Sequence, residues 1–364
     1  MSRKTDTLYA IPAIFVAIFV YALVSSQVYV WIGIPGDSWQ VYDIAQGLGA
    51  ILWGILSDFF CRKKTVIISH ILAFPFLILV YYFSNQIVFA ILFGLVYNPL
   101  PILRAALVDN MRRTSKIRLI AYSFVLQFLP TAIYTHFTTL GKPLALLLSI
   151  GALIFCLMMI GVLFEDVRDR SIAQHKEKHI FFESKGAMRK GVFTFLAFIP
   201  TQFIYFISAV YLDSYGDSPV LYSLLFLGFV IGALISSLYK STPHTSVLTV
   251  TYGVSITIAM IPLCAITLYQ YHHPSLIFLF VLLACLAGFY ISFVYDVVLH
   301  NIGKTLRGSA CGMLDGVFFG TAELSLIIVG HLKFNIIIAL ICIIFSFAFA
   351  LFFQKFAELH SEIK

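Results

Sequence analysis

The sequence has very little charge for its length. Charged residues make up 11% of the 364 residues and hydrophobic residues make up 60%, whereas a soluble protein has roughly 25% charged residues. This shortage excludes an ordinary set of soluble domains. Runs of about 20 apolar residues, the length that crosses a bilayer core, recur from one end of the chain to the other. The composition therefore predicts an integral membrane protein.

The sequence also lacks the motifs of catalysis and metal binding. Its six cysteines are scattered and none has CxxC spacing, which argues against a metal site and against an extracellular disulfide framework. We find no nucleophile–base pair, zinc-ligand pattern or phosphate-binding loop, so we expect neither enzymatic activity nor a cofactor. The first apolar run, 8–31, is too long for a signal-peptide core and is interpreted as a retained membrane helix.

Apolar runs separated by polar breaks predict about twelve membrane helices. The longest break, 165–190, follows the sixth of them and is interpreted as a cytoplasmic linker. The chain is thus predicted to form two six-helix bundles, 1–164 and 191–364. The expected spans are 8–31, 39–59, 65–83, 86–108, 117–137, 143–164, 191–213, 218–239, 245–269, 275–300, 308–331 and 333–354.

The distribution of basic residues predicts the orientation of these helices, because Lys and Arg accumulate on the cytoplasmic side. With the N-terminus inside, 21 of the 24 basic residues fall on that side. Lys142 and Lys333 fall outside, and Arg104 lies within a span. Both termini are therefore predicted to be cytoplasmic. The net charge of +7 is explained by topology and by contact with anionic membrane lipids, without a nucleic-acid partner.

The loop after the second span carries a motif. It fits the pattern G-x-L-x-D-R-x-G-R-R/K-x-S/T, with Phe59 and Cys61 in place of an arginine and a glycine. The matching residues are Gly54, Leu56, Asp58, Arg62, Lys63 and Thr65. This loop resembles the signature of the major facilitator superfamily, and a weaker copy ends the eighth span. The resemblance implies an all-α membrane fold of two pseudo-twofold six-helix bundles around a midplane site.

In that family the motif holds one conformation closed, together with the acidic end of the fourth helix. A half-buried carboxylate needs a cation or an N–H group as its partner, and a glycine permits close helix approach. A similar acid and base, Asp296 and Arg307, recur around the end of the tenth span. The resemblance implies a conformational latch formed by Gly54, Asp58, Arg62, Asp109 and Arg118.

Arg104 is the leading candidate for a residue that handles cargo. A charge at the centre of a membrane helix costs about 2.5–3.5 kcal/mol, so it needs a functional reason. Asn98, Pro99 and Pro101 precede it, and the helix is expected to bend just before Arg104. The side chain could bind an anionic solute or pair with a carboxylate. The alternative is that it extends to the cytoplasmic interface.

Two carboxylates of the eleventh span, Asp315 and Glu323, are the candidate proton carriers. An apolar setting favours the neutral carboxyl group over the charged one, which allows protons to be exchanged near neutral pH. Glu323 shares a face with a stripe of glycines at four-residue spacing (308, 312, 316 and 320), which suits tight helix packing. For Glu323 the alternative is therefore a structural hydrogen bond between helices.

Polar residues recur at helical spacing in the fifth, seventh and tenth spans. Facing lipid they would lack hydrogen-bond partners, so we expect them to face one another or a shared polar cavity. Among aromatic residues, Tyr205, Tyr290 and Tyr295 are the best cavity candidates, whereas Asp43 is expected to be hydrated and His70 to be packed. The expected substrate-binding residues are Arg104, Gln127, Thr131, Gln202, Tyr205 and Asp296. Structural contacts between helices are the alternative.

The resemblance implies a secondary transporter that works by alternating access. The fifth span has no glycine and lacks the G-x-x-x-G-P-x-x-G-G signature of drug/proton antiporters in the family. This favours uptake, and Arg104 favours an anionic cargo such as a metabolite or siderophore, with protons as the coupling ion. A monomer in a bacterial inner membrane is expected. The alternatives are a multidrug or metabolite exporter and, in another class, a non-transporting receptor or scaffold.

Overall fold

The computed structural model describes residues 3–32, 37–84, 86–109, 116–133, 141–164, 219–239, 276–301 and 306–330. All regular structure in these ranges is helical. The helices are α1 (Arg3–Ile32), α2 (Asp37–Phe59), α3 (Arg62–Tyr82), α4 (Ile87–Val96), α5 (Leu100–Asp109), α6 (Lys116–Ala132), α8 (Lys142–Leu163), α11 (Pro219–Ser237), α13 (Leu276–Asn301) and α14 (Arg307–Gly330).

The predicted spans coincide with these helices wherever the two can be compared, and their ends differ by a few residues. The expected spans 191–213, 245–269 and 333–354, and the expected linker, lie outside the described residues. Within the described residues, four stretches are long and apolar enough to cross a membrane, namely 10–32, 62–82, 87–109 and 142–163. The expected all-α membrane fold is confirmed.

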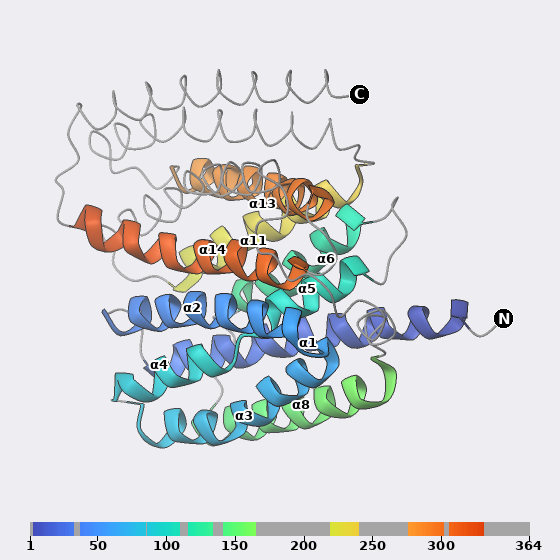
Figure 1. The fold of residues 1–364 in the computed structure, drawn as a ribbon. Helices are drawn as coiled ribbons and strands as arrows, with labels where there is room; N and C mark the ends of the chain where they lie inside the picture. Colours follow the sequence, from blue (N-terminus) through green and yellow to red (C-terminus); the bar gives the residue numbers. More distant parts are fainter. Residues whose placement is uncertain are drawn as a thin grey trace.

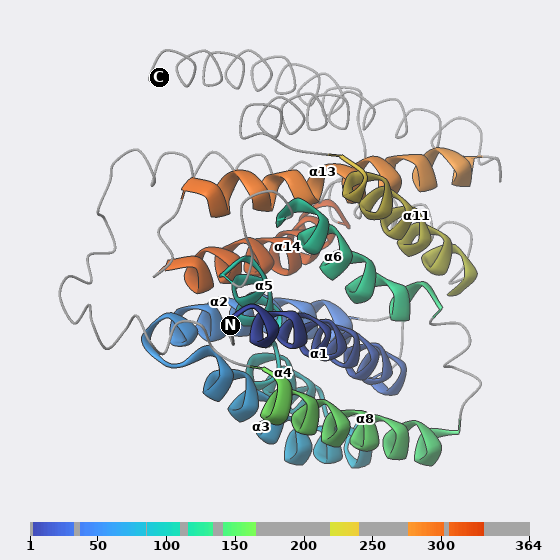
Figure 2. The ribbon, with the colours of Figure 1, turned by 90° about the vertical axis from the view of Figure 1, so that its right-hand side faces the viewer.

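The helices lie side by side, and helices distant in the sequence are neighbours. α2 lies beside α14 in both views, α3 and α8 form one outer face, and α13 lies on the opposite side of the molecule (Figure 1, Figure 2). α6 packs against α11 and α13. The contacts of α2 with α14 and of α6 with α11 join helices from the first half of the chain to helices from the second half.

The fourth span is broken between α4 and α5, where the sequence predicts a bend before Arg104. Residues 97–99 are not helical, because Pro99 has no N–H group to donate and disfavours the helical conformation in the residue before it. A break inside a membrane releases backbone carbonyls that need donors. Trp53 Nε1 donates to the Leu95 carbonyl at 3.1 Å, and Ser69 Oγ donates to the Val96 carbonyl at 3.2 Å. The break is therefore supported by α2 and α3.

The α2–α14 interface is a close backbone contact made by small residues. A methyl group added at Gly312 would lie 2.6 Å from the Ala50 carbonyl oxygen and 3.1 Å from the Gly54 Cα atom. A methyl group at Gly316 would lie 2.9 Å from the Gly47 carbonyl oxygen. The glycine stripe therefore packs against α2, as its spacing predicts.

Candidate functional site

Arg104 lies at the centre of a buried polar cluster formed by α5, α6, α13 and α14. Its side chain is fully buried. The guanidinium forms an ion pair with Asp315 of α14 and donates hydrogen bonds to Gln127 and Ser123 of α6, the latter at 3.3 Å. Tyr295 of α13 lies 3.5 Å from Nη1. Of the three expected roles for Arg104, pairing with a carboxylate is the one realised in this conformation.

Asp315 is the acidic centre of this cluster. Its Oδ1 atom receives both Arg104 and the Tyr295 hydroxyl, the latter at 2.5 Å. Its Oδ2 atom is buried and has no hydrogen-bond partner among the described residues. One oxygen is thus held by a cation while the other retains a free lone pair. This arrangement can accept a proton on Oδ2 without first breaking a hydrogen bond.

Aromatic rings cover the Arg104 guanidinium. Its central carbon lies 4.0 Å from the centroid of the Phe124 ring and 5.2 Å from that of Tyr295. A cation over an aromatic face is stabilised by the ring quadrupole, by about 2 kcal/mol or more when water is excluded. Phe124 precedes Gln127 by three residues on α6, so one helical face supplies both a hydrogen-bond acceptor and an aromatic ring to the same cation.

The other expected substrate-binding residues have different positions. Thr131 lies further along α6, where its hydroxyl is 3.4 Å from that of Ser26 in α1. Asp296 is buried in α13, and the residue before it, Tyr295, is the one that contacts Arg104 and Asp315. Gln202 and Tyr205 lie outside the described residues, as does the side chain of Glu323.

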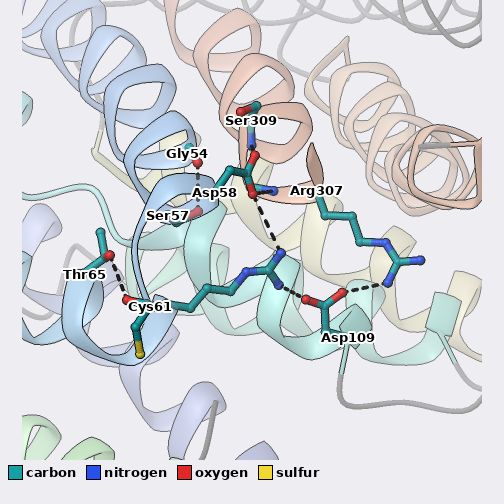
Figure 3. Close-up of polar contacts among 10 residues, drawn as sticks. Gly54, Ser57, Asp58, Cys61, Thr65, Asp109, Arg307 and Ser309 are labelled. Carbon is teal, nitrogen blue, oxygen red and sulfur yellow. Dashed lines mark hydrogen bonds and ion pairs between the residues drawn. The ribbon is translucent and has the colours of Figure 1, made fainter. Parts of the chain in front are cut away.

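A second charged cluster lies where α2, α5 and α14 meet, at the end of the helices that carries the motif. We call this end the basic end, since Lys63 and Lys64 follow here. The Asp58 carboxylate accepts hydrogen bonds from the backbone N–H groups of Gly308, at 3.0 Å, and Ser309, at 2.6 Å (Figure 3). These are two of the four free N–H groups at the start of α14, and a helix N-terminus attracts negative charge. The motif carboxylate therefore joins the end of α2 to the start of α14.

Asp109 links two arginines in the same cluster. It forms an ion pair with Arg62 of α3 and another with Arg307 of α14, at 2.7 Å (Figure 3). Arg62 also lies 3.9 Å from Asp58. The structure thus brings together Gly54, Asp58, Arg62 and Asp109, as the sequence predicts.

Arg118 does not join the other predicted latch residues. It lies in the first turn of α6 with an exposed side chain, and Arg307 is the second arginine at Asp109. The signal for this was present in the sequence. Arg307 begins α14 directly before Gly308 and Ser309, so the contact of Asp58 with that helix start brings Arg307 to Asp109.

A third polar cluster, inside the first bundle, was missed by sequence reasoning. Asp43 is buried, whereas we expected it to be hydrated, because Tyr29 of α1 covers it and donates a hydrogen bond to its carboxylate. Gln46 Nε2, one turn along α2, donates to Ser25 Oγ at 3.2 Å and to the Tyr42 hydroxyl at 2.6 Å. The two polar residues Ser25 and Tyr29, four apart on α1, were the available signal.

His70 is packed as expected. It is fully buried, its Nδ1 atom lies 2.9 Å from the Val66 carbonyl oxygen, and its Nε2 atom lies 3.3 Å from Cys156 Sγ. Its ring also meets that of Tyr97 edge-on at 5.2 Å. Among the described residues, no group of three or more metal-binding side chains is found.

Comparison with known proteins gives one sequence match and several similar structures. The Major Facilitator Superfamily profile matches residues 23–322. No curated protein sequence matches the chain. The structure of the human organic anion transporter MFSD10 (TETRAN) is similar with a TM-score of 0.70 and 11% identity, over 97% of this chain and 98% of that one.

Two further similar structures are also transporters. A point mutant of the nucleoside transporter NupG has a TM-score of 0.59 and 13% identity, over 96% of this chain and 99% of that one. The major facilitator superfamily transporter FucP, in the outward conformation, has a TM-score of 0.62 and 14% identity, over 97% of this chain and 99% of that one.

Proposed function

Because the chain belongs to the major facilitator superfamily and is thus a multi-pass membrane transporter of a small molecule, we propose that it takes up an organic anion together with a proton. The two bundles are proposed to be 1–164 and 191–364, joined by 165–190, and to expose a central site alternately to each side of the membrane. The family membership and the absence of catalytic motifs from the sequence agree with a protein that is not an enzyme.

The buried Arg104–Asp315 ion pair is the observation that carries this proposal. The side chains of Arg104 and Asp315 are 0% and 2% exposed, and they come from different bundles. Burying two charges costs several kcal/mol per ion, and a hydrophobic pair of similar volume is often as stable or more stable. Structural stability alone therefore accounts poorly for the pair. A binding site for an anion and a proton accounts for both charges.

Competition for Arg104 would couple cargo to protons. With Asp315 ionised, its carboxylate holds the guanidinium and leaves no cation for an anionic cargo. A proton on the free Oδ2 atom neutralises Asp315, so that Arg104 can bind a carboxylate of the cargo with strong, charge-assisted hydrogen bonds. Gln127 and Tyr295 keep the guanidinium oriented during the exchange. The similarity in fold to MFSD10, an organic anion transporter, agrees with an anionic cargo.

The cluster at the basic end is proposed to be the conformational latch. Asp58, Arg62 and Asp109 hold the start of α14 against α2 and α5, and this contact has to break before the bundles can separate at that end. The excess of basic residues there supports a cytoplasmic location for this end and for both termini. The conformation described is then closed toward the cytoplasm. A bacterial inner membrane, a monomeric state and Glu323 as a second proton carrier complete the proposal.

The test uses a variant in which both charges of the pair are neutralised, Arg104→Gln with Asp315→Asn. Removing one charge alone leaves the other buried without a partner, at a cost of about 3–5 kcal/mol, which could prevent folding. The double variant avoids that cost. Purified protein would be screened by thermal shift against mono- and dicarboxylates and their neutral amides. Transport would be measured in proteoliposomes with an imposed pH gradient.

We expect the wild-type protein to be stabilised by carboxylates and not by the amides, and to take up the same carboxylates when the outside is acidic. The double variant should keep its melting temperature but lose both responses. If it transports normally, the pair is structural and the proposal fails. If only lipophilic cations stabilise the protein, the exporter alternative replaces it.

A further inference from the structure

Five phenylalanines form a cluster at the contact between the two bundles, and one of them, Phe124, lies against Arg104. They are Phe124 and Phe128 of α6, Phe226 and Phe229 of α11, and Phe318 of α14, and we call them the phenylalanine cluster. The Phe128 ring is at its centre, with centroid distances of 5.8 Å to Phe226, 5.1 Å to Phe229 and 5.8 Å to Phe318. Phe128, Phe229 and Phe318 are all buried.

The cluster is continuous with the buried cation. Phe124 lies under the Arg104 guanidinium at 4.0 Å, and its ring stacks on that of Phe128 with an interplanar angle of 10°. Phe128 in turn stacks on Phe226 with an angle of 21°. A chain of ring contacts therefore leads from the guanidinium to α11. A cation at one end and stacked rings at the other match the two ends of an aryl carboxylate.

Opening of the transport site has to disrupt this cluster. Phe128 belongs to the first bundle, while Phe226, Phe229 and Phe318 belong to the second, so these ring contacts are lost when the bundles separate. Aromatic pairs contribute beyond the area they bury because offset and edge-on ring arrangements are favoured electrostatically. A flat ring of the cargo could replace the lost contacts, and an aliphatic chain could replace only the buried area.

We propose that the phenylalanine cluster binds an aryl group of the cargo, so that the substrate class is a carboxylate joined to an aromatic ring by a short linker. This inference rests on the proposed function, because it takes Arg104 as the group that binds the carboxylate. Phe124 and Phe128 are one helical turn apart, so their Cβ atoms are separated by about 5–6 Å. That separation suits a short aliphatic linker between ring and carboxylate.

The experiment compares 3-phenylpropionate with 3-cyclohexylpropionate and butyrate, by calorimetric titration of the purified full-length protein at acidic pH. The two larger acids have the same charge and linker and differ in the ring. The variants are Phe128→Leu, which removes the central ring, and Phe128→Tyr, which keeps one. Phe89→Leu is the matched control, because the Phe89 ring contacts Phe83, at the far end of α3, at 5.3 Å.

The wild type should bind 3-phenylpropionate at least about tenfold more tightly than 3-cyclohexylpropionate, as expected for the loss of one or two ring pairs. Phe128→Leu should reduce this preference to about twofold while its affinity for butyrate stays unchanged, which shows that the variant is folded. Phe128→Tyr and Phe89→Leu should keep the preference.

Two results would overturn the inference in different ways. If the cyclohexyl and phenyl acids bind equally, or if Phe128→Leu keeps the preference, the cluster only packs the bundles together, and the anion site at Arg104 stands. If none of the three carboxylates binds, the proposed function fails and the aryl subsite fails with it.

Discussion

Arg104 and Asp315 illustrate how one pair of side chains can serve both structure and transport. In the conformation described, each charge neutralises the other, which lets both stay buried. The same arrangement makes Asp315 a competitor of any anion at Arg104. In the mechanism that we propose, the protonation of this single carboxyl group decides whether cargo binds. This makes pH the most direct experimental variable for the site.

Asp315→Asn should remove the dependence of anion binding on pH. In the wild type, ionised Asp315 competes for Arg104, so carboxylate affinity should rise as the pH falls, by up to about tenfold per unit for one linked proton. An asparagine cannot ionise, so the variant, purified with a carboxylate present to pair with Arg104 and offset the lost charge, should bind the anion at all pH values with the affinity that the wild type reaches in acid. Titrations between acidic and alkaline pH would check this, and an unchanged slope in the variant would assign the linked proton to another group.

Asp58→Asn should slow transport without weakening cargo binding. The carboxylate accepts hydrogen bonds from two backbone N–H groups of α14, and it lies 3.9 Å from the Arg62 guanidinium. Hydrogen bonds to a charged group contribute about 1.5–3 kcal/mol each, so loss of the charge destabilises the closed basic end. Proteoliposome uptake would give the rate and thermal shift the affinity. A large loss of affinity with normal turnover would contradict the latch assignment.

For single residues, the sequence predicts which side chains are functional better than it predicts which side chains they contact. Arg104, Asp315 and Gln127 stand out because polar groups within a membrane span need a reason, and the structure brings all three together. Which carboxylate meets Arg104 depends on how α14 packs on α5, and nothing local in the sequence encodes that. The same holds for Arg307, which pairs with Asp109, whereas Arg118 was the arginine that we expected in the latch besides Arg62.

At the level of the elements, α2 and α14 pack closely because glycines, which have no side chain, form their interface. Their backbones approach so closely that a methyl group at Gly312 would overlap with backbone atoms of Ala50 and Gly54. Backbone atoms cannot move aside as a flexible side chain can. The interface therefore depends on glycine at these positions, and a substitution there affects the closed conformation more than the rest of the fold.

Gly312→Ala should weaken closure of the basic end. Overpacking a tight contact costs about 1–3 kcal/mol. Here this cost destabilises the α2–α14 interface, which we propose to form only when the basic end is closed. Gly151→Ala in α8 is the control, because a methyl group there meets nothing within 4 Å. Uptake rates of both variants would be compared in proteoliposomes. Equal rates for Gly312→Ala and Gly151→Ala would show that the interface separates less than we propose.

The broken fourth span depends on side chains of neighbouring helices. Asn98→Ala should lower the melting temperature, since Asn98 Nδ2 donates to the Gln46 carbonyl at 2.8 Å inside the bundle. Loss of a buried hydrogen bond costs about 1–3 kcal/mol. Gln86→Ala removes an exposed amide without a capping hydrogen bond at the start of α4, and should leave the melting temperature unchanged. A fall of equal size in both variants would argue against the hydrogen bond as the cause.

The elements themselves were largely predictable from the sequence. Apolar runs indicated the helices, and Pro99 indicated the break between α4 and α5. The donors that make the break tolerable, Trp53 and Ser69, could not be predicted, because they lie on other helices and face the break only after packing. The expectation for Asp43 was wrong for the same reason, since Tyr29 covers it from α1.

For the whole molecule, the closed basic end can be followed with a native probe. Cys311 is fully buried on α14, close to the residues that Asp58 holds. In a variant that keeps Cys311 as its single cysteine, a small thiol reagent should react slowly. Adding Asp58→Asn should raise the labelling rate by at least about tenfold, the factor that corresponds to about 1.4 kcal/mol. An unchanged rate would mean that Asp58 does not control access to this end.

At the same scale, charge and hydropathy predicted the membrane fold, because both are averages over many residues. The arrangement of the bundles and the residues that face the centre depend on long-range packing. The motif around Asp58 is the exception, because its local spacing in the sequence also predicted a residue that contacts a distant helix.

The hydrogen bonds that stabilise the break between α4 and α5 also have a consequence for the biosynthesis of the protein. Leu95, Val96 and Asn98 bond to Trp53, Ser69 and Gln46, and all three partners precede the break in the chain. The ribosome therefore delivers α2 and α3 to the membrane before the interrupted span arrives. A ten-residue α4 and an arginine-bearing α5 would be poor candidates for independent insertion. In this order of synthesis, the hydrogen-bond partners of the broken span are already in the membrane when it inserts. A circular permutation that placed α4 and α5 before α2 and α3 would remove this advantage.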